Sequence, residues 1–167
     1  MAQRPEFRAI LEVLAQHKVD FVIVGGVAAA LHGAPVTTFD LDIVHSREGS
    51  NVDRLVSALR ELGAYYRERP EWRKPPDQEY LKGPGHHLLM TGAGPLDLLG
   101  AVATGDTYDQ LAPHSTKLDL TGGVSVLVLD LAGIIAIKER LDRERDRAVL
   151  PILRRTLRER QGGSSNE

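Results

Sequence analysis

Apolar positions along the chain change their period several times, and each change marks the end of one element and the start of another. Between residues 6 and 16 apolar side chains recur every three or four positions, which predicts an amphipathic helix. The next run, FVIV, is β-branched and stops at Gly25-Gly26, which predicts a buried strand. The same reasoning predicts a strand at 39–44, helices at 27–32, 50–62, 131–141 and 147–157, and hairpins that turn at 91–95 and 122–123.

This alternation predicts one α/β (α+β) domain over residues 1–160, with a small mixed sheet flanked by helices and two helices at the C-terminal end. Residues 67–85 interrupt the pattern, because they hold four prolines and few apolar side chains. They predict a long loop, for which a lid is one interpretation and whose role stays open. Residues 161–167 predict a flexible tail.

Composition narrows the class of protein. The chain has 167 residues, 42% of them hydrophobic, and a formal net charge of -2, so it can bury a core and has no global attraction for nucleic acid. It has no cysteine, which excludes disulfides and thiolate metal sites. No apolar run reaches the roughly 18 residues of a membrane span. We therefore expect a soluble cytoplasmic protein without a membrane partner.

The motif FDLDIV places two carboxylates on one face of a predicted strand. Asp40 and Asp42 are separated by one residue, so their side chains point the same way, while those of Phe39, Leu41 and Ile43 are expected to point into the core. The plainest interpretation is the solvent face of an edge strand. The alternative is a Mg²⁺ site, because Mg²⁺ prefers carboxylate oxygen and keeps positions open for substrate phosphates.

A third acid, Asp97 in GPLDLLG, lies alone within another apolar strand. A buried carboxylate needs a partner. If its strand lies beside the strand of Asp40 and Asp42, the three acids could hold two Mg²⁺ ions, with Mn²⁺ as an alternative, roughly 3.5–4 Å apart. Gly25 and Gly26 would let backbone amides approach a phosphate at the start of the following helix.

Together, FVIVGG, FDLDIV and GPLDLLGAV resemble the nucleotidyltransferase superfamily, in particular its polymerase-β-like minimal members, over residues 21–153. These members include nucleotidyltransferases of bacterial toxin–antitoxin systems. The resemblance implies that Lys138 and the pair Arg145-Asp146 help to bind the nucleotide. Two positions depart from the family pattern: Val27 stands where many members have serine, and DRERD replaces a GRPKD turn.

The resemblance implies a metal-dependent enzyme in which Asp40, Asp42 and Asp97 are catalytic and hold the metal, and which transfers a nucleoside monophosphate (NMP) from an NTP. The favoured acceptor is tRNA, in a toxin-like role with a cognate antitoxin. A protein side chain or an antibiotic are the other acceptors. A different class of function is a non-catalytic antitoxin or regulatory partner on the same fold. The motifs do not choose among the four NTPs.

Overall fold

The computed structural model describes residues 5–163 and contains a seven-stranded mixed sheet with the strand order β3-β4-β5-β2-β1-β7-β6. Four of the neighbouring pairs are antiparallel, and the pairs β1–β7 and β2–β5 are parallel. The strands are β1 (Phe21–Val24), β2 (Leu41–His45), β3 (Tyr65–Tyr66), β4 (His86–Thr91), β5 (Gly94–Leu99), β6 (Ser115–Leu120) and β7 (Val124–Leu129).

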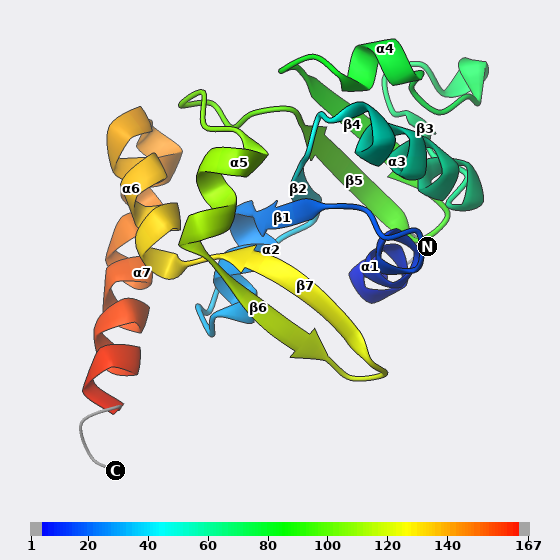
Figure 1. The fold of residues 1–167 in the computed structure, drawn as a ribbon. Helices are drawn as coiled ribbons and strands as arrows, with labels where there is room; N and C mark the ends of the chain where they lie inside the picture. Colours follow the sequence, from blue (N-terminus) through cyan, green and yellow to red (C-terminus); the bar gives the residue numbers. More distant parts are fainter. Residues whose placement is uncertain (1–4, 164–167) are drawn as a thin grey trace.

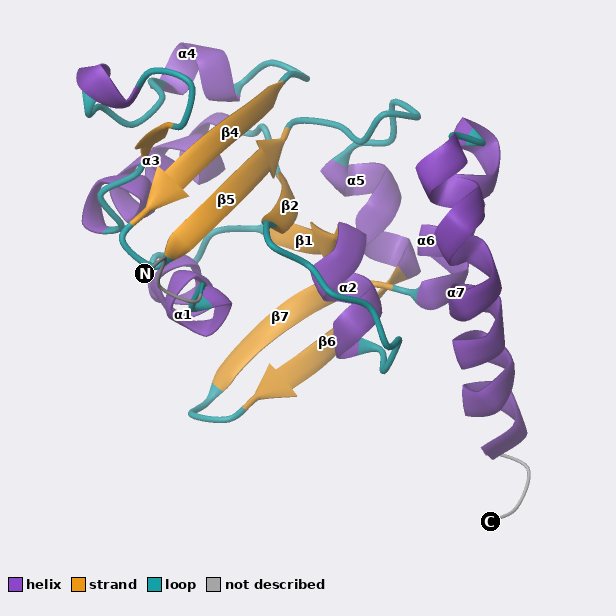
Figure 2. Ribbon diagram, turned by 180° about the vertical axis from the view of Figure 1, so that it is seen from behind, coloured by secondary structure: helices purple, strands orange, loops and turns teal. Residues whose placement is uncertain are grey.

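Helices cover the two faces of this sheet unequally. In Figure 1 α3 and α5 lie in front of the sheet, whereas Figure 2, seen from behind, has α2 in front of β1, β6 and β7. In that second view no helix of the described chain covers β4 and β5. The α-helices are α1 (Phe7–Gln16), α2 (Gly25–Leu31), α3 (Gly49–Glu61), α4 (Gln78–Leu81), α5 (Tyr108–Leu111), α6 (Leu131–Leu141) and α7 (Glu144–Gly163).

The main core lies between the sheet and the helices α1 and α3. Leu14, Ile23, Ile43, Leu59 and Leu98 are all completely buried there. Alternate residues of β2 and β5 therefore point into this core, and the residues between them must point to the opposite face. Within the described residues, no helix combines the length and the apolar character that a membrane crossing requires.

Most of the predicted elements are present, but the predicted orientation of Phe39 is wrong. Its side chain is 73% exposed, because β2 begins only at Leu41. The residues before the strand form a bend, in which the Thr38 hydroxyl donates a hydrogen bond to the backbone oxygen of Asp40. The alternation of a strand therefore does not extend back to Phe39.

The segment 67–85 is more ordered than its prolines suggest. It follows the short strand β3 and contains the 3₁₀ turn η1 (Pro70–Trp72) and helix α4. Helix α5 was not predicted, because it is only four residues long. Helix α7 extends through Gly163, so the first three residues of the predicted tail are helical, and residues 164–167 lie outside the described chain.

Candidate active site

Strand register brings the predicted acids together. Asp42 of β2 pairs directly with Asp97 of the parallel strand β5, and on its other side with Val24 of β1. Asp97 in turn pairs with Leu88 of β4. Because directly paired residues share a face, Leu88, Asp97, Asp42 and Val24 form a single row across the sheet, opposite the main core.

All the residues that the sequence proposed for the site line one cavity of about 580 Å³ next to this row. One end is formed by β4, β5 and the loop after β5, and includes Leu88 and Val102. The other end is formed by α6 and the start of α7. The proposed residues among its walls are Gly25, Gly26, Asp40, Asp42, Asp97, Lys138, Arg145 and Asp146.

Arg67 is a residue of this site that the sequence analysis missed. Its Nη2 donates to Asp97 Oδ1 at 2.7 Å, and its Nη1 lies 3.8 Å from Asp40 Oδ1. Its backbone amide donates to Leu88 O, so it continues the row of Leu88, Asp97 and Asp42. In the sequence Arg67 opens a proline-rich loop, and only the pairing of β3 with β4 gives it a place beside the acids.

Repulsion among the carboxylates is only partly relieved by Arg67. Burial, together with the neighbouring charges of Asp97 and Asp40, raises the pKa of Asp42 from 3.8 to about 7. Burial also raises the pKa of Asp97, although the guanidinium of Arg67 opposes this. The row therefore holds more negative charge than the protein neutralises, which makes it a place where an additional cation would be stabilised.

Gly25 lies so close to Asp42 that a side chain at position 25 would displace Asp42 or the start of α2. A Cβ atom at position 25 would lie 2.4 Å from Asp42 Oδ2, and the backbone φ of +68° also favours glycine. At Gly26 a Cβ atom would meet the side chain of Thr38 at 2.9 Å. Both glycines lie in the first turn of α2, which begins directly after β1. Their missing side chains keep the cavity open beside Asp42.

At the α6–α7 end, two of the residues that the resemblance implied for nucleotide binding, Lys138 and Asp146, are paired with each other. Asp146 is completely buried and accepts hydrogen bonds from Arg143, with 2.6 Å between Nε and Oδ2. Lys138 Nζ lies 3.4 Å from Asp146 Oδ1. Asp146 therefore pairs with Arg143 and Lys138 and joins the turn between the two helices. Arg145 lines the same cavity as these three residues.

Replacing Asp146 by asparagine should destabilise the fold by roughly 1–3 kcal/mol, because it leaves Arg143 and Lys138 without their buried anion. Hydrogen bonds from Arg143 lower the pKa of Asp146 to about 2. The stability from this ionised group is complete above about pH 4 and is lost as the pH falls through 2. Denaturant unfolding at pH 7 and pH 3 measures both effects.

The matched control is Asp142→Asn in the same turn, because its carboxylate pairs with Arg147 but is 67% exposed. It should change the free energy of unfolding by less than about 0.5 kcal/mol. Equal losses from the two variants would show that Asp146 does not hold the turn together.

None of the described side chains form a cluster of three or more histidines or acids in an arrangement that would hold a metal ion by itself. The predicted set of three carboxylates, Asp42 and Asp97 in the row and Asp40 just before β2, is therefore not a closed cage. A Mg²⁺ ion is usually bound by one or two carboxylates together with substrate phosphates, so such a row remains compatible with it.

Comparison with known proteins identifies the fold. A sequence model described as aminoglycoside-2''-adenylyltransferase matches residues 6–80. The structure of a Thermotoga maritima protein assigned to the nucleotidyltransferases has a TM-score of 0.56 with this chain at 19% identity, covering 92% of this chain and 91% of that one. The fold is that of the nucleotidyltransferase superfamily.

Two further solved structures share this nucleotidyltransferase fold. ANT(2'')-Ia in complex with adenylyl-2''-tobramycin has a TM-score of 0.57 at 14% identity, covering 90% of this chain and 87% of that one. The lincosamide antibiotic adenylyltransferase LnuA, with lincomycin bound, has a TM-score of 0.56 at 13% identity, covering 89% and 94%. No curated protein sequence matches the chain. The fold class predicted from the sequence is thus confirmed, and it is the fold of the predicted superfamily.

Proposed function

We propose that this protein transfers an NMP from an NTP to a hydroxyl group of a small acceptor molecule, with Mg²⁺ as cofactor. The observation that carries the proposal is the row of Asp97 and Asp42 beside the side-chain-free start of α2, within a nucleotidyltransferase fold. The acids, the glycines and Lys138 line the same cavity, so one bound NTP can touch all of them.

The donor set suits Mg²⁺. Asp40 and Asp42 offer carboxylate oxygens, and burial together with the neighbouring carboxylates raises the pKa of Asp42, so a bound cation would favour its ionised form. Asp40 is 46% exposed and can turn toward an incoming ion. When bound, Mg²⁺ neutralises the triphosphate and polarises the reacting phosphate. Mn²⁺ has similar ligand preferences and is the alternative ion.

Each remaining residue has a separate task in this proposal. The acceptor oxygen attacks the α-phosphorus, the bond to pyrophosphate breaks, and the hydroxyl proton passes to the Asp97 carboxylate. Lys138 offsets triphosphate charge from the α6 side, and Arg145 lies at the same end. Gly25 lets the triphosphate approach Asp42 without a side chain between them.

A small acceptor is favoured over the tRNA that the sequence analysis preferred. An RNA-binding face on α6 and α7 would need free basic side chains, but four arginines of these helices are engaged in ion pairs within the protein. These pairs are Arg140 with Asp106, Arg147 with Asp142, Arg154 with Glu139, and Arg155 with Glu159. The relatives named for antibiotics point the same way.

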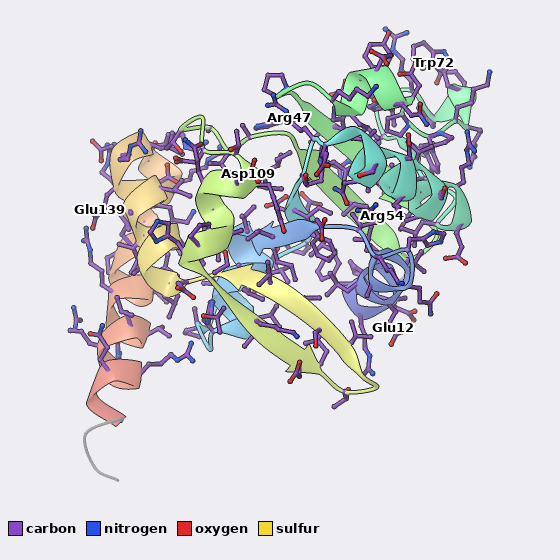
Figure 3. All side chains as sticks on the ribbon, viewed as in Figure 1. Glu12, Arg47, Arg54, Trp72, Asp109 and Glu139 are labelled. Carbon is purple, nitrogen blue, oxygen red and sulfur yellow. The ribbon has the colours of Figure 1, made fainter. Side chains whose placement is uncertain are left out.

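The exposed ring of Trp72 is a candidate for stacking on a base of tRNA, but it is also engaged within the protein. The Arg69 guanidinium already stacks 4.4 Å from its ring centre. Figure 3 places Trp72 near α4, at the opposite end of the molecule from Glu139 of α6. The tRNA acceptor, the toxin role and the cognate antitoxin stay predictions, as does the non-catalytic alternative.

The proposal is tested by incubating the protein with each α-labelled NTP, Mg²⁺ and two groups of acceptors: tRNA, and a set of hydroxyl-bearing small molecules. Label should move to a small molecule and not to tRNA. Thermal unfolding with Mg²⁺ and a nonhydrolysable NTP should show a raised melting temperature, because ligands that bind only the folded state stabilise it. Absence of both transfer and stabilisation would overturn the proposal, whereas transfer to tRNA alone would restore the toxin-like alternative.

A further inference from the structure

The two ends of the cavity differ in charge. The end at α6 and α7 carries the cations Lys138, Arg143 and Arg145, which suit a triphosphate. The end at β4 and β5 is walled mainly by apolar side chains, namely those of Leu88, Leu99, Val102 and Ala103, together with His86. If the triphosphate takes the basic end, the acceptor must approach Asp97 from the apolar one, which we call the acceptor end.

The sheet continues beyond this end as an open surface. Tyr65 pairs with Met90, and Met90 pairs with Pro95, so these residues share the face of Leu88 and Asp97. Leu88 is 36% exposed although it lies directly beside Asp97 in the row. Figure 2 shows β4 and β5 without a covering helix on this side, within the described chain. An acceptor can therefore reach Asp97 across β4.

Two guanidinium groups, those of Arg67 and Arg73, lie on this open surface. Arg67 reaches over the position of Leu88 to bind Asp97 at 2.7 Å. A second guanidinium, that of Arg73, lies 4.8 Å from the ring centre of Tyr65 on the same face. Among the described residues that line this end of the cavity, the only carboxylates are those of Asp42, Asp97 and Asp40. Arg67 already contacts Asp97 and Asp40.

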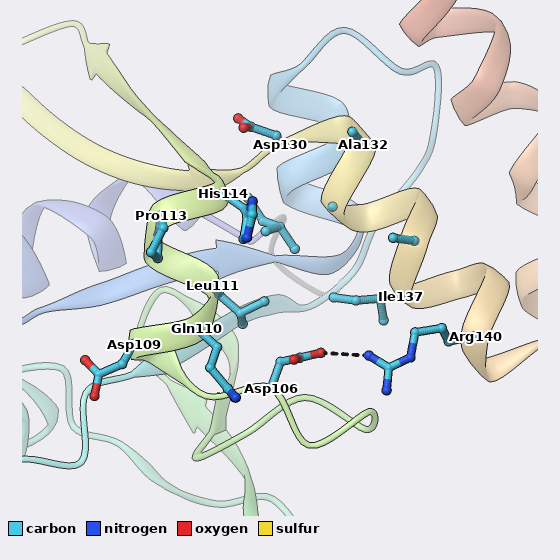
Figure 4. Close-up of a pocket in the computed structure, with 13 residues that line it drawn as sticks. Asp106, Asp109, Gln110, Leu111, Pro113, His114, Asp130, Ala132, Ile137 and Arg140 are labelled. Carbon is cyan, nitrogen blue, oxygen red and sulfur yellow. Dashed lines mark hydrogen bonds and ion pairs between the residues drawn. The ribbon is translucent and has the colours of Figure 1, made fainter.

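Asp106 follows the residues of the acceptor end in the sequence, but its carboxylate forms an ion pair outside that end. Asp106 comes four residues after Val102, but its carboxylate pairs with Arg140 at 3.4 Å. Figure 4 shows this pair across a second cavity, between α5 and α6, with Gln110 beside it. Asp106 therefore adds no negative charge for an acceptor that approaches Asp97 over β4.

We propose that Arg67 determines the charge of the acceptor, so that the acceptor end takes an uncharged or anionic hydroxyl compound and rejects polycations. This inference rests on the proposed transfer reaction. A polycation would have to place its ammonium groups near the guanidiniums of Arg67 and Arg73, while the carboxylates that could attract it are held by Arg67 or needed for the metal. Like charges brought together in this way lower affinity strongly. The chain would thus differ in acceptor from ANT(2'')-Ia, which was solved with an adenylylated tobramycin.

The test compares tobramycin with fully N-acetylated tobramycin, which keeps the hydroxyl groups but has no ammonium groups. Binding of each compound is measured by titration calorimetry with the wild-type protein, Arg67→Glu and Arg67→Gln. Arg67→Glu should bind tobramycin at least about tenfold more tightly than the wild type does, with a smaller gain in Arg67→Gln. The gain should shrink as the salt concentration rises. Arg69→Glu is the matched control, because Arg69 stacks on Trp72 instead of contacting the acids, and it should leave tobramycin binding unchanged.

Transfer assays give the second readout. In the wild type, kcat/KM should be higher for the N-acetylated compound than for tobramycin, and Arg67→Glu should reduce or reverse that preference. A wild type that binds or labels tobramycin more readily than the acetylated form would overturn the inference. So would equal tobramycin binding by the wild type and both Arg67 variants. Failure of the transferase proposal itself would appear differently, as no stabilisation by Mg²⁺ and NTP, and leaves the calorimetric comparison intact.

Discussion

Replacing Asp42 by asparagine is expected to reduce NMP transfer by about a thousandfold or more while making the metal-free protein more stable above pH 7. Asp42 lies at the centre of the row, paired with Asp97 on one side and Val24 on the other. Its loss removes a carboxylate that the proposed mechanism needs to hold Mg²⁺ against the triphosphate. Losses of this size are typical when a central charge-stabilising group is removed.

The same substitution is expected to lower activity and raise stability, and the gain in stability has a physical cause. The pKa of Asp42 is raised from 3.8 to about 7 in the folded protein, so the fold disfavours the ionised form. As the pH rises from about 4 to about 7, the unfolded chain becomes charged at this position first, and folding stability falls. Asparagine removes this effect, and a gain of about 3 °C or more in melting temperature at pH 8 is expected.

Thermal unfolding between pH 4 and pH 8, without metal, measures this difference. The two proteins should converge near pH 4 and separate as the pH rises. Added Mg²⁺ should then stabilise the wild type and leave Asp42→Asn nearly unaffected. Asp53→Asn on α3 is the control, because Asp53 is exposed on the other side of the sheet. Parallel pH profiles for the wild type and Asp42→Asn would contradict the raised pKa of Asp42.

Replacing Gly25 by alanine should both destabilise the protein and inactivate it. The φ of +68° at Gly25 makes a side chain unfavourable by about 1–2 kcal/mol. In addition, the new Cβ atom would lie 2.4 Å from Asp42 Oδ2, so either Asp42 or the start of α2 must move. A displacement of about 1 Å at a catalytic group can cost about a hundredfold in rate. Denaturant unfolding and kcat measure the two effects.

The variant Gly33→Ala separates the effect of backbone strain from the effect of displacing Asp42. Gly33 also has a positive φ, of +94°, but no atom lies within 4 Å of where its Cβ would be. This variant should lose a similar amount of stability and keep its activity and its stabilisation by Mg²⁺ and NTP. If Gly33→Ala lost as much activity as Gly25→Ala, the effect at Gly25 would come from general destabilisation and not from contact with Asp42.

The elements that the sequence predicted correctly are those with a strong local signal. The strand FVIV and the helix at 50–62 have regular apolar periods and glycines at their ends, and β1 and α3 occupy nearly the same residues. Phe39 was misplaced because a period of two is ambiguous at the end of a strand, where a single bend turns a side chain from the core to solvent. The order of the acids along the chain was enough to predict a nucleotidyltransferase fold.

The sequence by itself determined which residue types are present for chemistry: three aspartates in or just before strands, a glycine pair after a strand, and a lysine in a late helix. Only the tertiary structure decided how they are paired. The register of β2 with β5 places Asp97 beside Asp42, and the pairing of β3 with β4 brings Arg67 to both Asp97 and Asp40. Strand pairing joins residues that are far apart in the chain, and no local pattern encodes which strands become neighbours. For that reason the acids could be predicted from the sequence, whereas the arginine that pairs with two of them could not.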